Sequence, residues 1–241
     1  MGRGWEGLAL KVMRGRDFAF TVTTAEDVTT DCRRVRFADG GMLDATGVHP
    51  TMWVRLWFPE AGRPHQRAYT LVDPDPAAGT FGIDFALHDG PASRWASAAA
   101  PGDSIQATVQ GSAFAAPEPT PRRMFLVGDR ASAPAIGSLL RALPGVPATI
   151  WLETQHDSDE RLPVSRTGRD HHDFRFVPRE DAGGRLAAQV RTALPGLLGD
   201  PAEAYVWIAC DTVTTRELAR FVRKDLGVPR PRTHALGYWR P

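Results

Sequence analysis

Hydrophobic and polar positions follow a two-residue alternation through the first half of the chain. Short runs rich in β-branched and aromatic residues are separated there by turn residues. Such runs occupy residues 18–28, 32–39, 51–59, 67–75, 80–88 and 104–112. This regular spacing predicts an antiparallel β-barrel or sandwich. One helix is predicted within it after residue 90, where apolar positions take helical spacing until Pro101-Gly102 ends the pattern.

The pattern changes beyond a proline-rich stretch at residues 115–123, which favours an extended linker. Apolar runs at 123–129, 147–154, 175–178 and 204–211 predict strands, and amphipathic segments at 134–145, 184–198 and 215–227 predict helices. Strands that alternate with helices build a parallel sheet with a crevice at the carboxyl ends of its strands. We therefore expect a β-barrel domain at residues 1–116 and an α/β domain at residues 122–241.

Composition narrows the classes of function. The formal net charge of +1 does not suit a protein that binds nucleic acid. Every apolar run is shorter than the roughly 20 residues that cross a bilayer, and the first residues lack the features of a signal peptide. We therefore expect a cytoplasmic protein that requires neither a membrane nor an obligate protein partner. The 2 cysteines cannot build a disulfide framework or a cysteine-ligated metal site, so redox chemistry would need an organic cofactor.

The first candidate site segment is Arg67-Ala68-Tyr69-Thr70. An aromatic ring at a strand end can cover a flavin, a threonine hydroxyl can bond the edge of the flavin ring, and an arginine can neutralise a pyrophosphate. On spacing alone, an ordinary hairpin explains the segment more simply than a flavin site does.

The second segment runs from His88 to Trp95 and enters the predicted helix of the barrel half. Backbone N–H groups at a helix start bind phosphate, and Ser93 could add a hydroxyl donor. The alternative is that Ser93 only caps the helix and that His88 is satisfied locally.

Two strand ends in the second half could approach a nucleotide. Gly128-Asp129 leads into a helix that contains Pro134, and Ala209-Cys210-Asp211 leads into another, although a full GxGxxG motif is absent. A buried cysteine is more often a core residue than a catalyst, so we expect Cys210 to be part of the core.

In this order the segments resemble the siderophore-interacting protein family, the FAD-dependent ferric-siderophore reductases within the ferredoxin–NADP reductase superfamily. The matching pieces are RAYT, HDGPASRWA with the following PGD, VGDxxxxPAI, VWIA and the terminal GYWR. The resemblance implies that the barrel holds FAD and that the α/β domain receives NAD(P)H. Electrons would pass through the flavin to a small-molecule substrate, a ferric siderophore, which releases Fe(II).

The resemblance also assigns roles to individual residues. Tyr69 and Thr70 would lie at the reacting flavin, and Arg230, Arg232 and Arg240 would form a cationic surface for the siderophore. The FAD-binding residues would be Arg67, Ala68, Tyr69, Thr70, His88, Pro91, Ala92, Ser93 and Trp95. Those near the nicotinamide nucleotide would be Gly128, Asp129, Pro134, Ala209 and Asp211. Trp239, next to the end of the chain, could stack on a cofactor or simply dock the tail.

Several positions depart from the family pattern. The family usually has glutamate at the position of Arg130 and Ala-Gly-Glu where this chain has Ala209-Cys210-Asp211. A side chain at Cys210 could obstruct a nucleotide that needs bare backbone, so FAD binding is better supported than NAD(P)H binding. Two alternatives therefore remain. One is a flavoenzyme on this scaffold that acts on an organic metabolite, and the other is a non-catalytic protein that binds a ferric chelate or flavin. Arg161, Arg166 and Arg179 are candidates for a 2′-phosphate site, although a solvated surface role explains each of them more simply.

Overall fold

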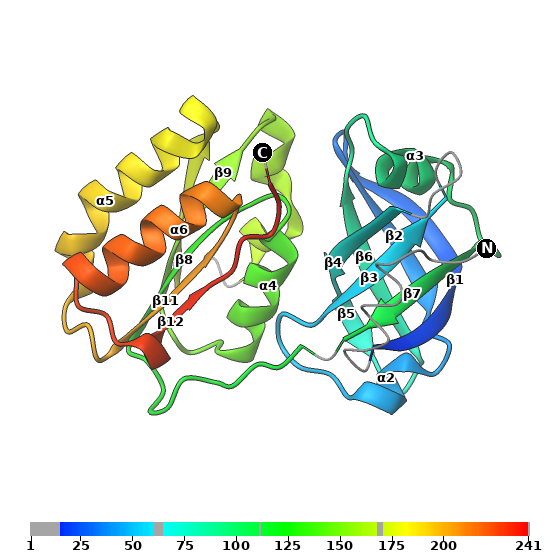
Figure 1. Cartoon of the computed structure of the whole chain (residues 1–241), viewed down its shortest axis with the longest axis horizontal. Coiled ribbons are helices and arrows are strands. Elements are labelled where there is room, and N and C mark those ends of the chain that lie inside the picture. The colour runs from blue at the N-terminus through cyan, green and yellow to red at the C-terminus, as the bar shows by residue number, and fades with distance from the viewer. Residues whose placement is uncertain (1–14, 60–64, 111, 168–170, 241) are drawn as a thin grey trace. The chain divides into compact units, whose positions relative to one another are not determined.

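The chain divides into two compact units between Phe114 and Ala115, at the start of the proline-rich stretch. This computed structural model describes residues 15–59, 65–110, 112–167 and 171–240. Figure 1 shows the strands of each unit. Within the described residues, every helix is too short or too polar to cross a bilayer.

The N-terminal unit is one curled antiparallel sheet. Its strands are β1 (Arg16–Thr29), β2 (Cys32–Ala38), β3 (Trp53–Phe58), β4 (His65–Thr70), β5 (Val72–Asp75), β6 (Thr80–Ala86) and β7 (Ser104–Val109), arranged in the order β4-β3-β7-β1-β2-β6-β5. The single residue Leu71 separates β4 from β5, yet these strands form opposite edges of the sheet. The sheet must therefore curl so that its two edges meet at Leu71, which confirms the expected barrel-like architecture.

One detail of the strand prediction was wrong. The run at residues 67–75 was taken as one strand, but it forms β4 and β5. Leu71 is buried and its N–H donates to the carbonyl of Met52 at 2.9 Å, which fixes the chain at the point where it passes from one edge to the other. A β-branched and aromatic run has the same composition whether it is straight or turns a corner, so the pattern could not reveal the break.

The inner face of this sheet is filled by aromatic rings. Phe20, Phe37, Phe58, Phe81 and Phe85 are almost completely buried. The ring centroids of Phe20 and Phe81 lie 4.9 Å apart in an edge-to-face arrangement, which is a preferred geometry for aromatic pairs. The predicted helix is present as α3 (Pro91–Ala98), and a short helix that the pattern did not indicate, α2 (Met42–Thr46), precedes β3.

The C-terminal unit is a five-stranded parallel sheet between helices, as predicted. The strands β8 (Arg123–Asp129), β9 (Ala148–Thr154), β10 (His172–Pro178), β11 (Ala204–Ala209) and β12 (Thr233–Ala235) take the order β10-β9-β8-β11-β12. Helices α5 (Gly184–Leu198) and α6 (Thr212–Arg220) lie side by side on one face, and α4 (Ala133–Ala142) covers the other (Figure 1). The strand order reverses between β8 and β11, and this is where open α/β sheets place a ligand crevice.

Three elements of this unit differ from the predicted pattern. Helix α6 begins three residues before the predicted start because Asp211 caps it: its Oδ1 accepts from the N–H groups of Val213 and Thr214 at 2.9 and 3.0 Å. A π-helical turn, Phe221–Asp225, follows α6 where a continuous helix was expected. The three-residue strand β12 was not predicted, because so short a run carries no periodicity.

Candidate functional site

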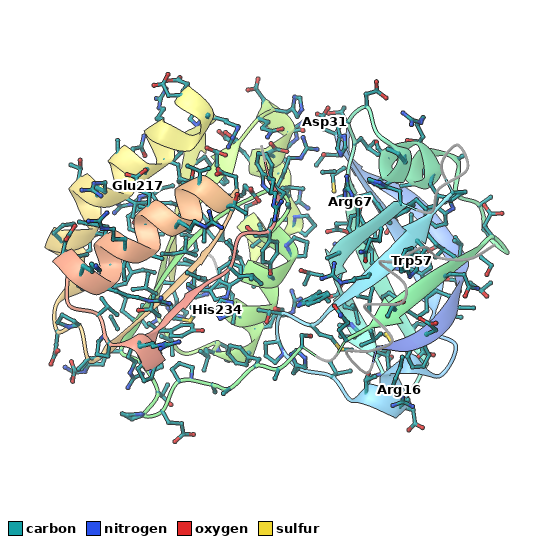
Figure 2. The ribbon with its side chains drawn as sticks, in the orientation of Figure 1. Arg16, Asp31, Trp57, Arg67, Glu217 and His234 are labelled. Atoms are coloured by element: carbon teal, nitrogen blue, oxygen red, sulfur yellow. The ribbon has the colours of Figure 1, made fainter. Side chains whose placement is uncertain are left out.

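Strand β4 carries the first predicted segment at one edge of the curled sheet. Arg67 and Ala68 are exposed, Tyr69 is half-buried and Thr70 is buried. Figure 2 labels Arg67, whose guanidinium donates to the carbonyl of the adjacent Gln66 at 2.9 Å and otherwise extends into solvent. Burial raises the pKa of the Tyr69 hydroxyl, and the charge of Arg67 opposes this shift. Tyr69 is therefore a neutral aromatic group that lies two residues from an accessible cation.

Helix α3 carries the second segment. Pro91 occupies the first turn, where its missing N–H removes no helical bond, and the small residues Ala92 and Ser93 follow it. Ser93 is buried, and its hydroxyl accepts from the backbone N–H of His88 at 2.9 Å. The His88 side chain is exposed, with Nδ1 3.1 Å from the carbonyl of Asp89. The serine thus holds the loop that leads into the helix, and the first backbone N–H groups of α3 lack helical acceptors by geometry.

The two segments converge on one pair of aromatic side chains. The ring of Tyr69 lies 6.0 Å from that of Phe58 and 4.6 Å from that of Phe85, measured between centroids. Trp95 of α3 contacts the same two rings, at 5.8 and 6.0 Å. Strand β4 and helix α3 are therefore neighbours within the unit. Phe58 and Phe85 were not among the predicted site residues, because buried phenylalanines in strands look like ordinary core.

The donor set near this pair fits a flavin dinucleotide. Arg67 supplies an exposed guanidinium for a pyrophosphate, and the start of α3 supplies backbone N–H groups for the same type of charge. Gly90 precedes the helix, and a Cβ atom there would lie 2.9 Å from the exposed His88 ring, so a larger residue at this position would have to displace that ring. Small residues at the helix start and an aromatic ring on the adjacent strand are features suited to phosphates and a planar ring system.

The carboxyl edge of the parallel sheet carries the third and fourth segments. Gly128 of β8 is paired with Ala209 of β11, and a Cβ on Gly128 would lie 2.2 Å from the Ser132 hydroxyl, so only glycine fits this close approach. Pro134 lies in the first turn of α4 and is partly exposed.

Asp129 is buried at this edge and is fully engaged with the protein. Its Oδ1 accepts from the N–H groups of Ala131 and Ser132, and its Oδ2 accepts from the indole N–H of Trp239 at 2.6 Å. Burial raises the pKa of Asp129, and the Trp239 hydrogen bond is the largest effect that opposes this shift. The structure therefore brings Asp129 and Trp239 together, and the hydrogen bond places the indole against the end of β8.

Arg179, which follows β10, is held by other carboxylates of the same edge. Its guanidinium contacts Glu153 Oε2, lies 3.7 Å from Asp211 Oδ2, and covers the Trp239 ring at 4.9 Å from the centroid. Its side chain is only 17% exposed, so the expectation that it is a solvated surface arginine was wrong. Arg161 and Arg166 are exposed. Sequence reasoning also missed Glu153, although its position at the end of the second parallel strand is one where dinucleotide folds often carry an acid.

Two departures from the family pattern have structural explanations. Cys210 is fully buried in the core beside Thr215, with Sγ 3.4 Å from its hydroxyl, so its side chain does not enter the crevice and the expectation of a core cysteine is confirmed. Burial raises the pKa of the Cys210 thiol, which makes the thiol unreactive. Arg130 lies 3.8 Å from the buried Asp159 and joins the loops that follow β8 and β9.

The three arginines expected to contact substrate differ in exposure. Arg230 and Arg240 are exposed. Arg232 is 6% exposed and donates to the carbonyl of Pro119 at 2.7 Å. Arg232 therefore fastens the stretch before β8 and adds no charge to the surface, which corrects its predicted role.

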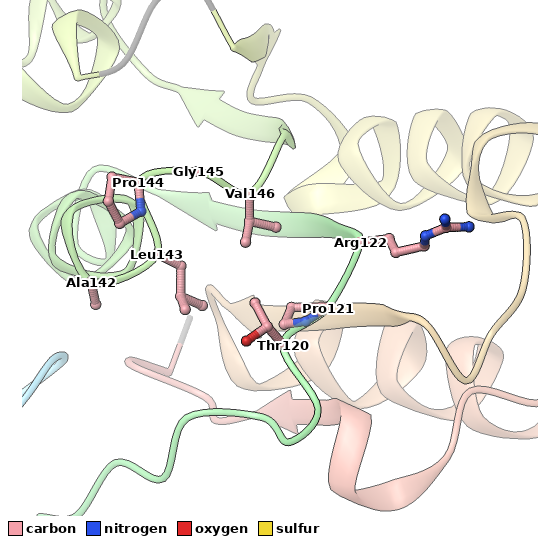
Figure 3. Close-up of a pocket in the computed structure, with 8 residues that line it drawn as sticks. All are labelled: Thr120, Pro121, Arg122, Ala142, Leu143, Pro144, Gly145 and Val146. Carbon is pink, nitrogen blue, oxygen red and sulfur yellow. The ribbon is translucent and has the colours of Figure 1, made fainter.

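A separate pocket of about 500 Å³ lies in the C-terminal unit near the amino ends of the parallel strands (Figure 3). It is open and is lined by residues 120–122, before β8, and 142–146, after α4. Because these residues lie at the amino end of β8, the pocket is remote from the crevice that the strand order predicts.

Both halves of the chain match sequence profiles of a single family. Residues 121–241 match the profile "Siderophore-interacting protein", and residues 45–112 match "Siderophore-interacting FAD-binding domain". The N-terminal unit is therefore an FAD-binding domain of this type.

Relatives and solved structures agree with this assignment. The mycobactin import ATP-binding/permease protein IrtA of Mycolicibacterium smegmatis is 34% identical over 99% of this chain, and that of Mycobacterium tuberculosis is 32% identical over the same share. The chain spans 28% of the length of each of these curated relatives. The siderophore-interacting protein of Acinetobacter baumannii superposes with a TM-score of 0.77 at 22% identity, covering 93% of this chain and 91% of the other.

A ferredoxin NADP+ reductase from Neisseria gonorrhoeae, solved with bound FAD and NADP, has the same fold, with a TM-score of 0.70 at 15% identity, covering 92% of this chain and 99% of the other. One profile match lies in each unit, the match at residues 121–241 spans half of the chain, and the chain belongs to the siderophore-interacting protein family.

Proposed function

We propose that this chain is a flavin-dependent reductase that takes electrons from NAD(P)H and delivers them to Fe(III) held by a siderophore. The observation that carries the proposal is the match of both units to siderophore-interacting profiles, one of which is an FAD-binding domain. The fold shared with a ferredoxin NADP+ reductase supports electron transfer through a flavin. The siderophore and the nucleotide donor remain parts of the proposal.

The N-terminal residues bind and orient the flavin in this proposal. Tyr69 borders the ring system, Thr70 offers a hydroxyl, and Arg67 and the start of α3 neutralise the pyrophosphate. The hydrogen bond from His88 N–H to Ser93 fixes the loop before α3, so the phosphate-binding groups are ordered before the ligand arrives. FAD, when bound, accepts two electrons as a hydride and releases them singly, so one NAD(P)H reduces two ferric ions to Fe(II).

The C-terminal residues hold the nucleotide at the carboxyl edge of the parallel sheet. Gly128 allows β8 to pack closely against the start of α4 at the strand switch point, where the nucleotide would lie, and Asp129 and Trp239 lie beside it. Arg230 and Arg240 remain the candidates for contact with an anionic ferric chelate, because they are exposed. Reduction releases the iron because Fe(II) binds hard oxygen ligands much less tightly than Fe(III) does.

Anaerobic absorption spectroscopy tests this function. NADH or NADPH is added to the FAD-loaded chain, and a ferric hydroxamate or catecholate chelate follows, together with a colorimetric Fe(II) trap. The proposal expects the flavin absorption to bleach and then recover as Fe(II) appears. Bound FAD that stays oxidised with both nucleotides would contradict the proposed electron donor. Flavin that bleaches but is not reoxidised by any ferric chelate would instead favour an organic substrate.

Variants link the activity to the proposed residues. Arg67→Gln should weaken FAD binding roughly tenfold, since hydrogen bonds to charged groups contribute about 1.5–3 kcal/mol. Arg16→Gln is the matched control, because Arg16 is also an exposed strand arginine of this unit; it lies on β1, donates to the carbonyl of Ala45 and covers the Phe18 ring. Equal FAD affinity in both variants would remove Arg67 from the site.

A further inference from the structure

The carboxyl edge of the C-terminal sheet carries more negative than positive buried charge. Four carboxylates are almost completely buried there, and within the described residues only two cations pair with them. The carboxylates are those of Asp129, Glu153, Asp159 and Asp211. The cations are Arg130, which lies 3.8 Å from Asp159, and Arg179, which contacts Glu153. A ligand at this edge therefore meets a negative field.

Glu153 stands at the position that distinguishes two kinds of dinucleotide. It lies at the end of the second parallel strand, about 25 residues after Gly128 at the end of the first. Dinucleotide folds use an acid near this point to bind the ribose 2′-hydroxyl, or an arginine to bind a 2′-phosphate. This chain has both types of residue in contact, so their pairing decides which ligand the edge accepts.

One oxygen of Glu153 lacks a donor. Oε2 contacts Arg179, but no described residue hydrogen-bonds to Oε1, and the glutamate is 1% exposed. Oε1 is enclosed by protein, so its charge lacks a local donor and a ligand does not reach it in this structure. The charge of the carboxylate acts at a distance, so it disfavours a phosphate dianion without touching it.

The charge of Arg179 is already used within the protein. The guanidinium contacts Glu153, lies 3.7 Å from Asp211 and stacks on the Trp239 ring. An arginine that binds phosphate strongly carries a charge that neighbouring carboxylates do not already compensate. The charge of Arg179 is compensated by Glu153 and Asp211, even though Arg179 is the cation next to Glu153.

We propose that Glu153, through its pairing with Arg179, makes the carboxyl edge select a dinucleotide without a 2′-phosphate, so that NADH is the electron donor in preference to NADPH. The inference rests on the proposed function and specifies its donor. Arg179 acts as a positioning residue that holds Glu153 and Trp239 in place.

Calorimetric titration of the FAD-loaded full chain with NAD⁺ and with NADP⁺ at pH 8 tests this selection without turnover. NAD⁺ should bind at least about tenfold more tightly, the effect expected for one added charge several ångströms from a carboxylate at an effective dielectric constant near 20. Glu153→Gln should strengthen NADP⁺ binding roughly tenfold and reduce the preference accordingly. Glu180→Gln is the matched control: Glu180 follows Arg179 but is exposed and pairs with Arg185, so its removal should change the ratio by less than about twofold.

Arg179→Lys keeps the positive charge that the buried carboxylates need and separates the two roles of this residue. If Arg179 is only a positioning residue, the ratio of NAD⁺ to NADP⁺ affinity stays unchanged in this variant. A selective loss of NADP⁺ binding would make Arg179 a phosphate ligand and overturn the inference. Equal or tighter binding of NADP⁺ by the unmodified chain would also overturn it and leave the reductase proposal intact. Binding of neither nucleotide would overturn both the inference and the proposed donor.

Discussion

Replacement of Trp239 by phenylalanine should destabilise the C-terminal unit through the loss of one hydrogen bond. The indole N–H donates to Oδ2 of the buried Asp129 at 2.6 Å. Phenylalanine keeps an aromatic ring beneath Arg179, so most of the cation–π contact survives. The backbone bond from Thr212 N–H to the carbonyl of residue 239 is also kept. The N–H group is therefore the main interaction that the substitution removes.

The magnitude follows from the charge and burial of the acceptor. A hydrogen bond to a charged group contributes about 1.5–3 kcal/mol, and the weaker cation–π contact adds roughly 0.5 kcal/mol. We expect Trp239→Phe to lower the free energy of unfolding by about 2–3 kcal/mol. Urea unfolding followed by far-UV circular dichroism measures this, because the three longest helices among the described residues, α4, α5 and α6, belong to the C-terminal unit.

A double-mutant cycle isolates the contact. In Asp129→Asn, the side-chain oxygen can still accept from Ala131 and Ser132, but an NH₂ group that cannot accept faces the indole. Trp239→Phe should then have little cost in the Asp129→Asn background, which gives a coupling energy of about 1.5 kcal/mol or more. The same destabilisation in both backgrounds would refute the reasoning, since the cost would then arise from packing.

Four further outcomes are expected. Ser93→Ala leaves the His88 N–H without its acceptor and should lower stability by about 1–2 kcal/mol and FAD affinity with it, measured by thermal melts and FAD titration; unchanged FAD affinity would disconnect this loop from the site. Tyr69→Ala should weaken FAD binding roughly tenfold while Tyr69→Phe retains it, and equal binding by both would exclude ring contact. Cys32 and Cys210 are both buried, so a thiol reagent should not label the folded chain and should label both cysteines after denaturation. Burial raises the pKa of Asp129, so the folded state binds the carboxyl proton of Asp129 more tightly than the unfolded state does. The stability of the chain relative to Asp129→Asn should therefore fall as pH rises from the unfolded-state pKa near 3.8 toward the folded-state pKa. A rise in relative stability over this range would contradict the raised pKa of Asp129.

Periodicity identified the fold because each unit buries one face of regular elements. Helix α5, Gly184–Leu198, has the predicted bounds, since its apolar positions repeat at helical spacing up to the glycine that follows it. The turn at Leu71 escaped prediction, because only the closure of the sheet shows that the two halves of one apolar run lie on opposite edges. Strand β12 was not predicted, because its three residues are held by pairing with β11 and are too few to show a hydrophobic alternation.

The candidate sites were predicted less completely than the fold. Tyr69 and the start of α3 were selected by residue type, and the structure makes them neighbours through Phe58 and Phe85. The pairing of Arg179 with Glu153 joins residues that follow or end different strands, and only the parallel register of β9 and β10 brings them together. Residues near Arg179 in the sequence do not indicate this pairing, so Arg179 was interpreted as a surface residue although buried carboxylates hold it.

The most direct test of the central claim is whether this chain holds FAD stoichiometrically. Freshly purified chain is incubated with excess FAD, separated from free flavin by gel filtration, and its absorption spectrum is recorded with the protein concentration. The account predicts about one oxidised flavin per chain, with its absorption bands shifted from those of free FAD by a less polar environment. A colourless protein after this treatment, with both units folded by circular dichroism, would contradict it.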